Sequence, residues 1–162
     1  MKKKSLTEFG NPILRTKTRN VPLLFLKTKK FNQLVKEMRQ VMHAAKGIGI
    51  AAPQVGVSLA IAVLETRPTP TRPNLKKRGP LTIVNPVILH TSKTNIGEWE
   101  GCLSFEGVRG KVTRPRSVKI SYFNEKGEQV REKATGLWAR LFQHEIDHLN
   151  GVVYVDRMLD MK

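Results

Sequence analysis

Two stretches with helical periodicity frame a run of short strand-like segments, and this order constrains the fold more than any other feature of the sequence. In the first stretch apolar residues recur at the three-and-four spacing of one helix face: Phe31, Leu34, Val35, Met38, Val41, Met42 and Ala45. The second stretch has the same spacing in Leu137, Trp138, Leu141, Phe142, Ile146 and Leu149. Gly47 and Gly151 follow where left-handed caps would end the two helices.

The segments between these helices have the composition of strands and turns. Leu59 to Leu64 and Leu81 to Leu89 are short, aliphatic or β-branched, and bounded by turn residues, which favours buried strands. Between them, Arg67 to Pro80 holds four prolines and five basic side chains, so we expect an exposed loop. Further strands are expected at Asn95 to Glu100, Ser117 to Phe123 and Glu128 to Ala134, the last two joined by a hairpin.

This order predicts an α+β fold, with mixed or antiparallel sheets packed around the helix of residues 137–149 and an N-terminal amphipathic helix at residues 31–45. At 162 residues the chain can form its own core, so we expect residues 1–162 to be a single compact domain.

The single cysteine, Cys102, cannot form an internal disulfide, which suits a reducing cytosol. No apolar run near the centre of the chain is long enough to cross a bilayer, and the polar start lacks the apolar core of an export signal. We therefore expect a cytoplasmic protein without a membrane span.

The formal charge of +16, from 29 Lys and Arg against 13 Asp and Glu, creates a field that attracts polyanions such as RNA. The basic residues are scattered, however, and no RNA-reading motif with interleaved aromatic side chains accompanies them. They gather in Lys2 to Lys4, Lys27 to Lys30, Arg67 to Arg78 and Lys111 to Arg116. Two interpretations stay open, a solvated basic surface and an RNA-facing patch, and the first is favoured.

The string His144-Glu145-Ile146-Asp147-His148 lies inside the second helical pattern. Residues four apart lie one turn above each other, so both imidazoles can grip one metal ion, with Glu145 placed to act on a bound water. Leu137 and Leu141 precede His144 on the same face, which should therefore point inward. Two histidines and an acid also occur together by chance in amphipathic helices, so the string alone does not decide for metal binding.

Two further segments carry candidate chemistry. Cys102, within residues 100–104, would add a thiolate to the two imidazoles and leave a fourth position for water, as catalytic sites do; taken alone, a free cysteine is most often a small buried hydrophobe. Residues 47–54, Gly-Ile-Gly-Ile-Ala-Ala-Pro-Gln, allow close approach of a peptide backbone, and Gln54 offers an amide donor for an oxyanion. Taken singly, this segment favours a helix cap and a turn with Gln54 exposed.

Residues 47–54, 100–104 and 143–151 resemble, in order and spacing, the three signature motifs of the peptide deformylase family. The resemblance extends over most of the chain, including residues 10–15 and the Arg114-Pro115-Arg116 run. It implies a metal-dependent hydrolase, cytoplasmic and monomeric, that removes the N-terminal formyl group from formyl-methionyl nascent polypeptides and releases formate. The implied partners are those nascent peptides and, through the basic surface, ribosomal RNA, but neither a membrane nor DNA.

By matching position, the resemblance makes Cys102, His144 and His148 the metal ligands and Glu145 the general acid and base. Metal-bound hydroxide would attack the formyl carbon, and Glu145 would carry the proton to the leaving amine. Gln54 and the backbone N–H of Leu103 would stabilise the oxyanion. The peptide would bind as an added strand in contact with Ile48, Gly49, Gly101 and Arg109.

The family is characteristically ferrous, so one Fe²⁺ ion is expected, with Zn²⁺, Ni²⁺ or Co²⁺ as substitutes. We also expect Glu100 to pair with Arg116 in support of the ligands.

Two departures from the family stand out. Phe105-Glu106-Gly107 replaces a small aliphatic residue and proline, so the substrate loop would differ in shape. Only eleven residues follow Gly151, whereas several bacterial relatives carry a long C-terminal helix that docks on the ribosome, so a ribosome contact would need other basic surface.

Two alternatives have a different chemistry. An HExxH metallopeptidase would need a third His or Glu ligand in place of Cys102, and the other histidines, His43 and His90, lie upstream without the matching spacing. A basic RNA- or ribosome-binding module without activity would be expected to lose a ligand or catalytic residue. All of these residues are intact.

Overall fold

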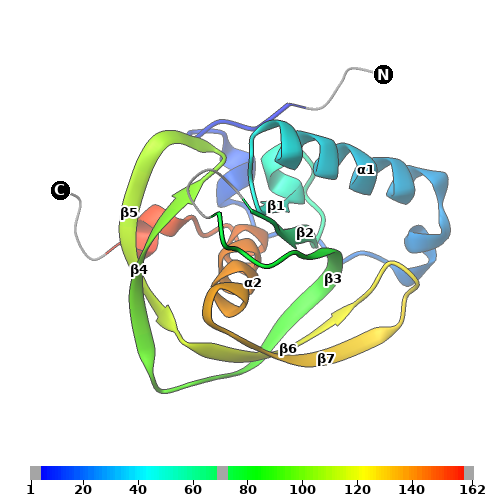
Figure 1. The fold of residues 1–162 in the computed structure, drawn as a ribbon. Coiled ribbons are helices and arrows are strands. Elements are labelled where there is room, and N and C mark those ends of the chain that lie inside the picture. Colours follow the sequence, from blue (N-terminus) through cyan, green and yellow to red (C-terminus); the bar gives the residue numbers. More distant parts are fainter. Residues whose placement is uncertain (1–4, 69–72, 159–162) are drawn as a thin grey trace.

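The computed structural model describes residues 5–68 and 73–158. Within them lie the helices α1 (Lys29–Ala44) and α2 (Gly136–Leu149), shown in Figure 1. The strands are β1 (Gly49–Ala51), β2 (Ile61–Thr66), β3 (Arg78–Thr91), β4 (Asn95–Cys102), β5 (Phe105–Pro115), β6 (Ser117–Phe123) and β7 (Gln129–Thr135). Short 3-10 helices span Pro12–Arg15, Leu23–Lys27, Ala52–Val55 and Tyr154–Arg157. No helix of the described residues is long and apolar enough to cross a membrane.

The strands form a larger sheet in the order β1-β2-β3-β6-β7 and a smaller sheet of β4 and β5. Every pairing between these strands is antiparallel. The turn between β6 and β7 is the predicted hairpin: the side chain of Asn124 accepts hydrogen bonds from the backbone of Lys126 and Glu128, and Gly127 takes a positive φ of 81°. The predicted α+β fold with antiparallel sheets is confirmed.

The larger sheet lies between the two helices. Alternate residues of β2 point to opposite faces: Ile61 and Val63 pack in a cluster with α1, whereas Ala62 and Leu64 pack in a cluster with α2. The smaller sheet covers another side of α2, which passes through the middle of the molecule (Figure 1). From Trp138 to Leu149 every residue of α2 is buried, so polar side chains on this helix must find partners inside the protein.

The ends of the two helices differ in how well the sequence predicted them. Gly151 does take a left-handed conformation after α2, with φ 74°. After α1, however, the left-handed residue is Lys46, with φ 54°, and the predicted cap at Gly47 is wrong. Gly47 has another role: a Cβ there would lie 2.7 Å from the Leu103 side chain, so the glycine lets two site segments pack closely.

Three strand predictions need correction. The predicted loop at residues 67–80 ends earlier, because β3 begins at Arg78; Pro80 lies where the β2–β3 register shifts, and this irregularity tolerates a missing N–H. Part of that loop, residues 69–72, lies outside the described residues, as do the lysines at 2–4. Strands β1 and β5 were not predicted. Proline and charged residues obscured β5, and the glycines of residues 47–54 indicated a turn.

Candidate active site

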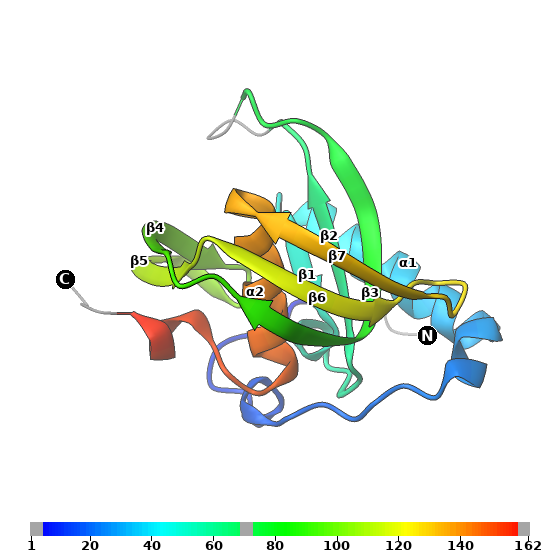
Figure 2. The ribbon, with the colours of Figure 1, turned by 90° about the horizontal axis from the view of Figure 1, so that it is seen from below.

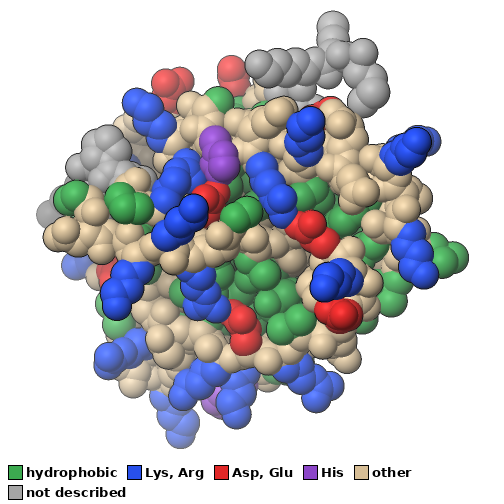
Figure 3. Space-filling model, turned by 45° about the vertical axis from the view of Figure 1, so that its right-hand side comes forward, with side chains coloured by type: hydrophobic (Ala, Val, Ile, Leu, Met, Phe, Trp, Pro, Cys, Tyr) green, Lys and Arg blue, Asp and Glu red, His purple; other side chains and the backbone are tan. Residues whose placement is uncertain are grey.

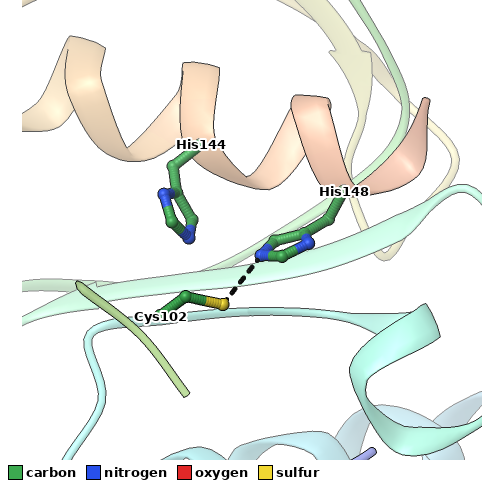
Figure 4. Close-up of side chains that lie close together, drawn as sticks. All are labelled: Cys102, His144 and His148. Atoms are coloured by element: carbon green, nitrogen blue, oxygen red, sulfur yellow. Dashed lines mark hydrogen bonds between the residues drawn. The ribbon is translucent and has the colours of Figure 1, made fainter. Parts of the chain in front are cut away.

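The three expected ligands converge, although they come from two distant segments (Figure 4). Sγ of Cys102, at the end of β4, lies 3.2 Å from Nε2 of His148. The rings of His144 and His148, one turn apart on α2, have centroids 4.9 Å apart. One potential ligand atom from each residue lies within 4.8 Å of the others. One thiolate and two imidazoles at this spacing fit a single divalent metal ion.

Glu100 orients His144. Nδ1 of His144 lies 3.0 Å from Oε2 of Glu100. Because an ionised carboxylate can only accept, Nδ1 carries the proton and Nε2 is left as the metal-binding nitrogen. The ring of His144 also stacks on Tyr154, with centroids 6.3 Å apart.

Buried arginines hold Glu100 in turn. Arg114 donates to both carboxylate oxygens, at 2.6 and 2.9 Å, and Arg140 donates at 2.6 Å. The second Nη of Arg114 donates to Asp147 at 2.7 Å, which ties the network back to α2. The predicted Glu100–Arg116 pair is wrong, because Arg116 lies beyond the end of β5 and is exposed, whereas Arg114 points inward from β5. Sequence reasoning missed Arg114 and Arg140; the one available signal was the position of Arg140, one turn before His144.

The protonation states of this network suit metal binding. Burial alone would raise the pKa of Glu100, but hydrogen bonds from His144 and Arg114 hold it well below its ordinary value. Burial, together with the nearby His144, lowers the pKa of His148, so its imidazole is neutral. Burial would also lower the pKa of His144, but hydrogen bonds with Cys102 and Glu100 raise it to about 10. The site thus attracts positive charge, and a metal ion would take the place of that proton.

Glu145 lies beside the ligands with an unsatisfied oxygen. Its Oε2 is buried and has no hydrogen-bond partner among the described residues, and the same holds for Nδ1 of His148. Such atoms are expected where a water or a substrate group binds. Burial raises the pKa of Glu145 to about 7, close to the range in which a general base works best at neutral pH.

Gln54 is buried, so the interpretation of an exposed amide is excluded. Its Oε1 accepts the backbone N–H of Ala51 at 2.9 Å. Its Nε2 therefore points to the metal site, 3.4 Å from Sγ of Cys102 and 3.3 Å from Oγ of Ser104. Ser104 was not singled out from the sequence. Leu103 lies in the tight turn between Cys102 and Phe105, so its backbone is next to the thiol ligand.

A cavity of about 650 Å³ lies beside the expected metal ligands and Glu145. His144, Glu145 and Gln54 line it, and so do all the residues expected to contact substrate: Ile48, Gly49, Gly101 and Arg109. The side chain of Arg109 lies over Gly101: a Cβ added at Gly101 would lie 3.6 Å from Cγ of Arg109. Trp99, which is 60% exposed, also lines the cavity and was not predicted as a site residue. The fold and this set of groups define a metal-dependent hydrolase.

Known proteins agree with that class. The family model for polypeptide deformylases matches residues 3–162. A peptide deformylase from Halothermothrix orenii is 41% identical over 154 residues, which cover 95% of this chain and 92% of that protein. A Met-Ala-Ser-bound class I type b peptide deformylase from Acinetobacter baumannii has a TM-score of 0.91 at 37% identity, covering 94% of this chain and 96% of that one. An actinonin complex of a peptide deformylase from Synechococcus elongatus has a TM-score of 0.84 at 37% identity, covering 97% and 79%.

The chain belongs to the polypeptide deformylase family. It is a hydrolase that removes the formyl group from formyl-methionyl nascent polypeptides. The resemblance drawn from the three motifs is confirmed, and the metallopeptidase and inactive-module alternatives fall away.

Proposed function

We propose that residues 1–162 act as one catalytic domain in which Cys102, His144 and His148 hold one divalent ion, Fe²⁺ in the cell, with Zn²⁺, Ni²⁺ or Co²⁺ as substitutes. The observation that carries the proposal is the convergence of three donor atoms beside the unpartnered carboxylate of Glu145. When bound, the ion supplies Lewis acidity, which activates a water and polarises the formyl carbonyl.

Glu145 moves the proton. Its carboxylate accepts a proton from the attacking water and donates it to the nitrogen that leaves the formyl carbon. A pKa of about 7 supports both directions of transfer near neutral pH. The Gln54 amide and the backbone N–H of Leu103 donate to the oxyanion that forms at the carbonyl oxygen. The hydrogen bond from Ala51 to Oε1 of Gln54 fixes which end of the amide faces the reaction.

The substrate lies as an added strand in the cavity, between the segment of Ile48 and Gly49 and the segment of Gly101 and Arg109. The two segments line the same cavity, which supports this placement. The Acinetobacter baumannii relative binds Met-Ala-Ser, which has the length and start of a deformylated peptide product. We infer that the methionine side chain enters the apolar part of the cavity, near Leu141 and Leu137.

The protein acts in the cytoplasm as a monomer and meets its substrates as they leave the ribosome. The formal charge of +16 supports a contact with ribosomal RNA through basic surface, independent of the nascent peptide.

The test loads the purified apoprotein anaerobically with one equivalent of Fe²⁺, Zn²⁺, Ni²⁺ or Co²⁺ and measures formate release from formyl-Met-Ala-Ser. We expect release with each ion, fastest with Fe²⁺ or its closest substitutes, and loss of both bound metal and release in Cys102→Ala. Because Cys102 is the single cysteine of the chain, no second thiol can replace it as a ligand. Full metal content in Cys102→Ala would therefore contradict the ligand set.

A further inference from the structure

Three basic side chains form a row across the larger sheet. Lys119 on β6 is paired directly with Lys133 on β7 and, on its other side, with His90 on β3. All three side chains are exposed. Directly opposed residues point to the same face, with Cβ atoms roughly 4.5–5.5 Å apart, and like charges in such a pair are destabilising. The Lys119–Lys133 pair is therefore unfavourable in the free protein unless an anion lies against it.

No acidic side chain of β3, β6 or β7 offsets this row. The single acid on these strands, Glu132, points to the other face, where it accepts hydrogen bonds from Trp138 and Arg78. Exposed Arg131, two residues before Lys133, adds another basic side chain to the same face. We call this set the basic sheet face: His90, Lys119, Arg131 and Lys133. Within the described residues, none of these four side chains forms an ion pair.

The basic sheet face is uncovered. Helix α1 packs on the same side of the sheet, but its cluster reaches β1, β2, Val84 and Phe123 and stops there. Figure 2 shows β3, β6 and β7 in front of α2, and no helix of the described residues lies over them. In Figure 3, Lys and Arg side chains gather along the lower edge of the molecule, where β6 and β7 lie in Figure 1. The catalytic helix α2 packs on the opposite face.

We propose that the basic sheet face binds the phosphate backbone of double-helical RNA. The proposal deepens the ribosomal RNA contact of the proposed function, rests on it, and assigns it a surface. Lysine is a good phosphate ligand, and each phosphate contact gains from counterion release. No exposed Phe, Tyr or Trp side chain lies on β3, β6 or β7 among the described residues, so apart from the His90 imidazole the face has no platform for stacked single-stranded bases and suits a duplex backbone. Docking there leaves the cavity on the other side free for the nascent peptide.

The test measures fluorescence anisotropy of a labelled RNA duplex of about 16 base pairs, the span of one double-stranded RNA-binding domain, at several KCl concentrations. The sheet variant Lys119→Gln/Lys133→Gln is compared with a matched variant on α1, Lys30→Gln/Lys36→Gln, whose lysines are also exposed. Both variants lower the net charge equally. We expect the sheet variant to lose affinity and to reduce the slope of log K against log salt by roughly two, since each lost phosphate contact reduces it by about one. The α1 variant should retain nearly the wild-type slope.

Three outcomes would overturn the proposal: no binding of the wild-type protein to the duplex, equal losses in the two variants, or binding through this face to phosphatidylglycerol vesicles and not to RNA. The sheet variant should unfold at or above the wild-type temperature, because the opposed like charges are gone, so unfolding does not explain a loss of binding. As a second variant, Lys119→Glu should weaken RNA binding further while forming a cross-strand ion pair with Lys133. Formate release from formyl-Met-Ala-Ser should stay at the wild-type rate in every variant, which separates this proposal from the proposed chemistry.

Discussion

A Cβ added at Gly49 would lie 2.2 Å from Oε1 of Glu145. The backbone of β1 and the carboxylate of α2 are therefore in direct contact, and the absence of a side chain at residue 49 sets where Glu145 can lie. Glycine is needed here for close approach and not for an unusual backbone conformation, because its φ is not in the left-handed region.

Replacing Gly49 by alanine should displace Glu145 without removing any chemical group. A displacement of about 1 Å in a reacting group can cost about 100-fold in rate, so we expect kcat/KM for formyl-Met-Ala-Ser to fall by about that factor while bound metal stays at one equivalent. Gly97→Ala on β4 is the control, because its Cβ would meet the flexible end of Lys111 far along the strand from Cys102. Wild-type turnover in Gly49→Ala would show that Glu145 is not positioned by β1.

Gln54→Ala removes a buried amide that points at the site. Loss of one oxyanion donor typically costs about 100- to 1,000-fold in kcat, and we expect that loss with little change in KM. Ser104→Ala, which removes only the neighbouring hydroxyl 3.3 Å away, should cost far less. Steady-state kinetics of the two variants test this, and a larger loss in Ser104→Ala would contradict the role given to Gln54.

The candidate site residues named from the sequence lie together in the structure, whereas the network that supports them was not predicted. Cys102, His144, Glu145 and His148 could be named as candidates because helical spacing places the two imidazoles on one face and because the resemblance to the three family motifs adds the thiol and the acid. The arginine that pairs with Glu100 could not be named from the sequence. The choice between Arg114 and Arg116 depends on which residues of β5 point inward and on where this strand ends, and β5 was not predicted. Missing β5 therefore led directly to the wrong arginine.

The elements of the fold also differ in how well the sequence predicted them. Long periodic helices were predicted within two residues of their bounds, because apolar residues recur at helical spacing along the whole of each helix. Strand β1 is three residues long and buried on both faces, so its sequence lacks the alternation of apolar and polar residues that indicates a strand. The left-handed residue after α1 is Lys46 because the helix ends earlier than its apolar pattern, and Gly47 is needed for packing against Leu103.

Glu100→Gln should weaken the hold on the metal. The amide cannot match the carboxylate that orients Nδ1 of His144, and loss of such a supporting partner typically costs about 10- to 100-fold in metal affinity or activity. It also removes the buried carboxylate that Arg114 and Arg140 share, so Arg114 keeps only the carboxylate of Asp147 and Arg140 keeps only that of the more exposed Glu98. We expect this loss to lower the free energy of unfolding by about 3–5 kcal/mol. Competition with a chelator and urea unfolding measure the two effects, and wild-type values for both would contradict the role of Glu100.

The lowered pKa of Glu100 also fixes the sign of a pH dependence. Burial would raise this pKa, but the hydrogen bonds from His144 and Arg114 lower it below the ordinary value of 4.5. The stability that the ionised form contributes is therefore fully present above about pH 4.5 and is lost as the pH falls further. We expect the difference in unfolding free energy between the wild type and Glu100→Gln to be constant from about pH 7 to 5 and to shrink below about 4.5. The matched variant Glu106→Gln, at an exposed residue, controls for the loss of one negative charge.

The proposed mechanism depends on proton transfer by buried Glu145 at a metal held by Cys102, His144 and His148. The decisive experiment compares formate release from formyl-Met-Ala-Ser by the anaerobic ferrous protein and by its Glu145→Ala variant, with metal content measured on the same samples. We predict one equivalent of metal in both proteins and formate release that disappears in the variant. Undiminished release from a Glu145→Ala protein that holds its metal would contradict the mechanism.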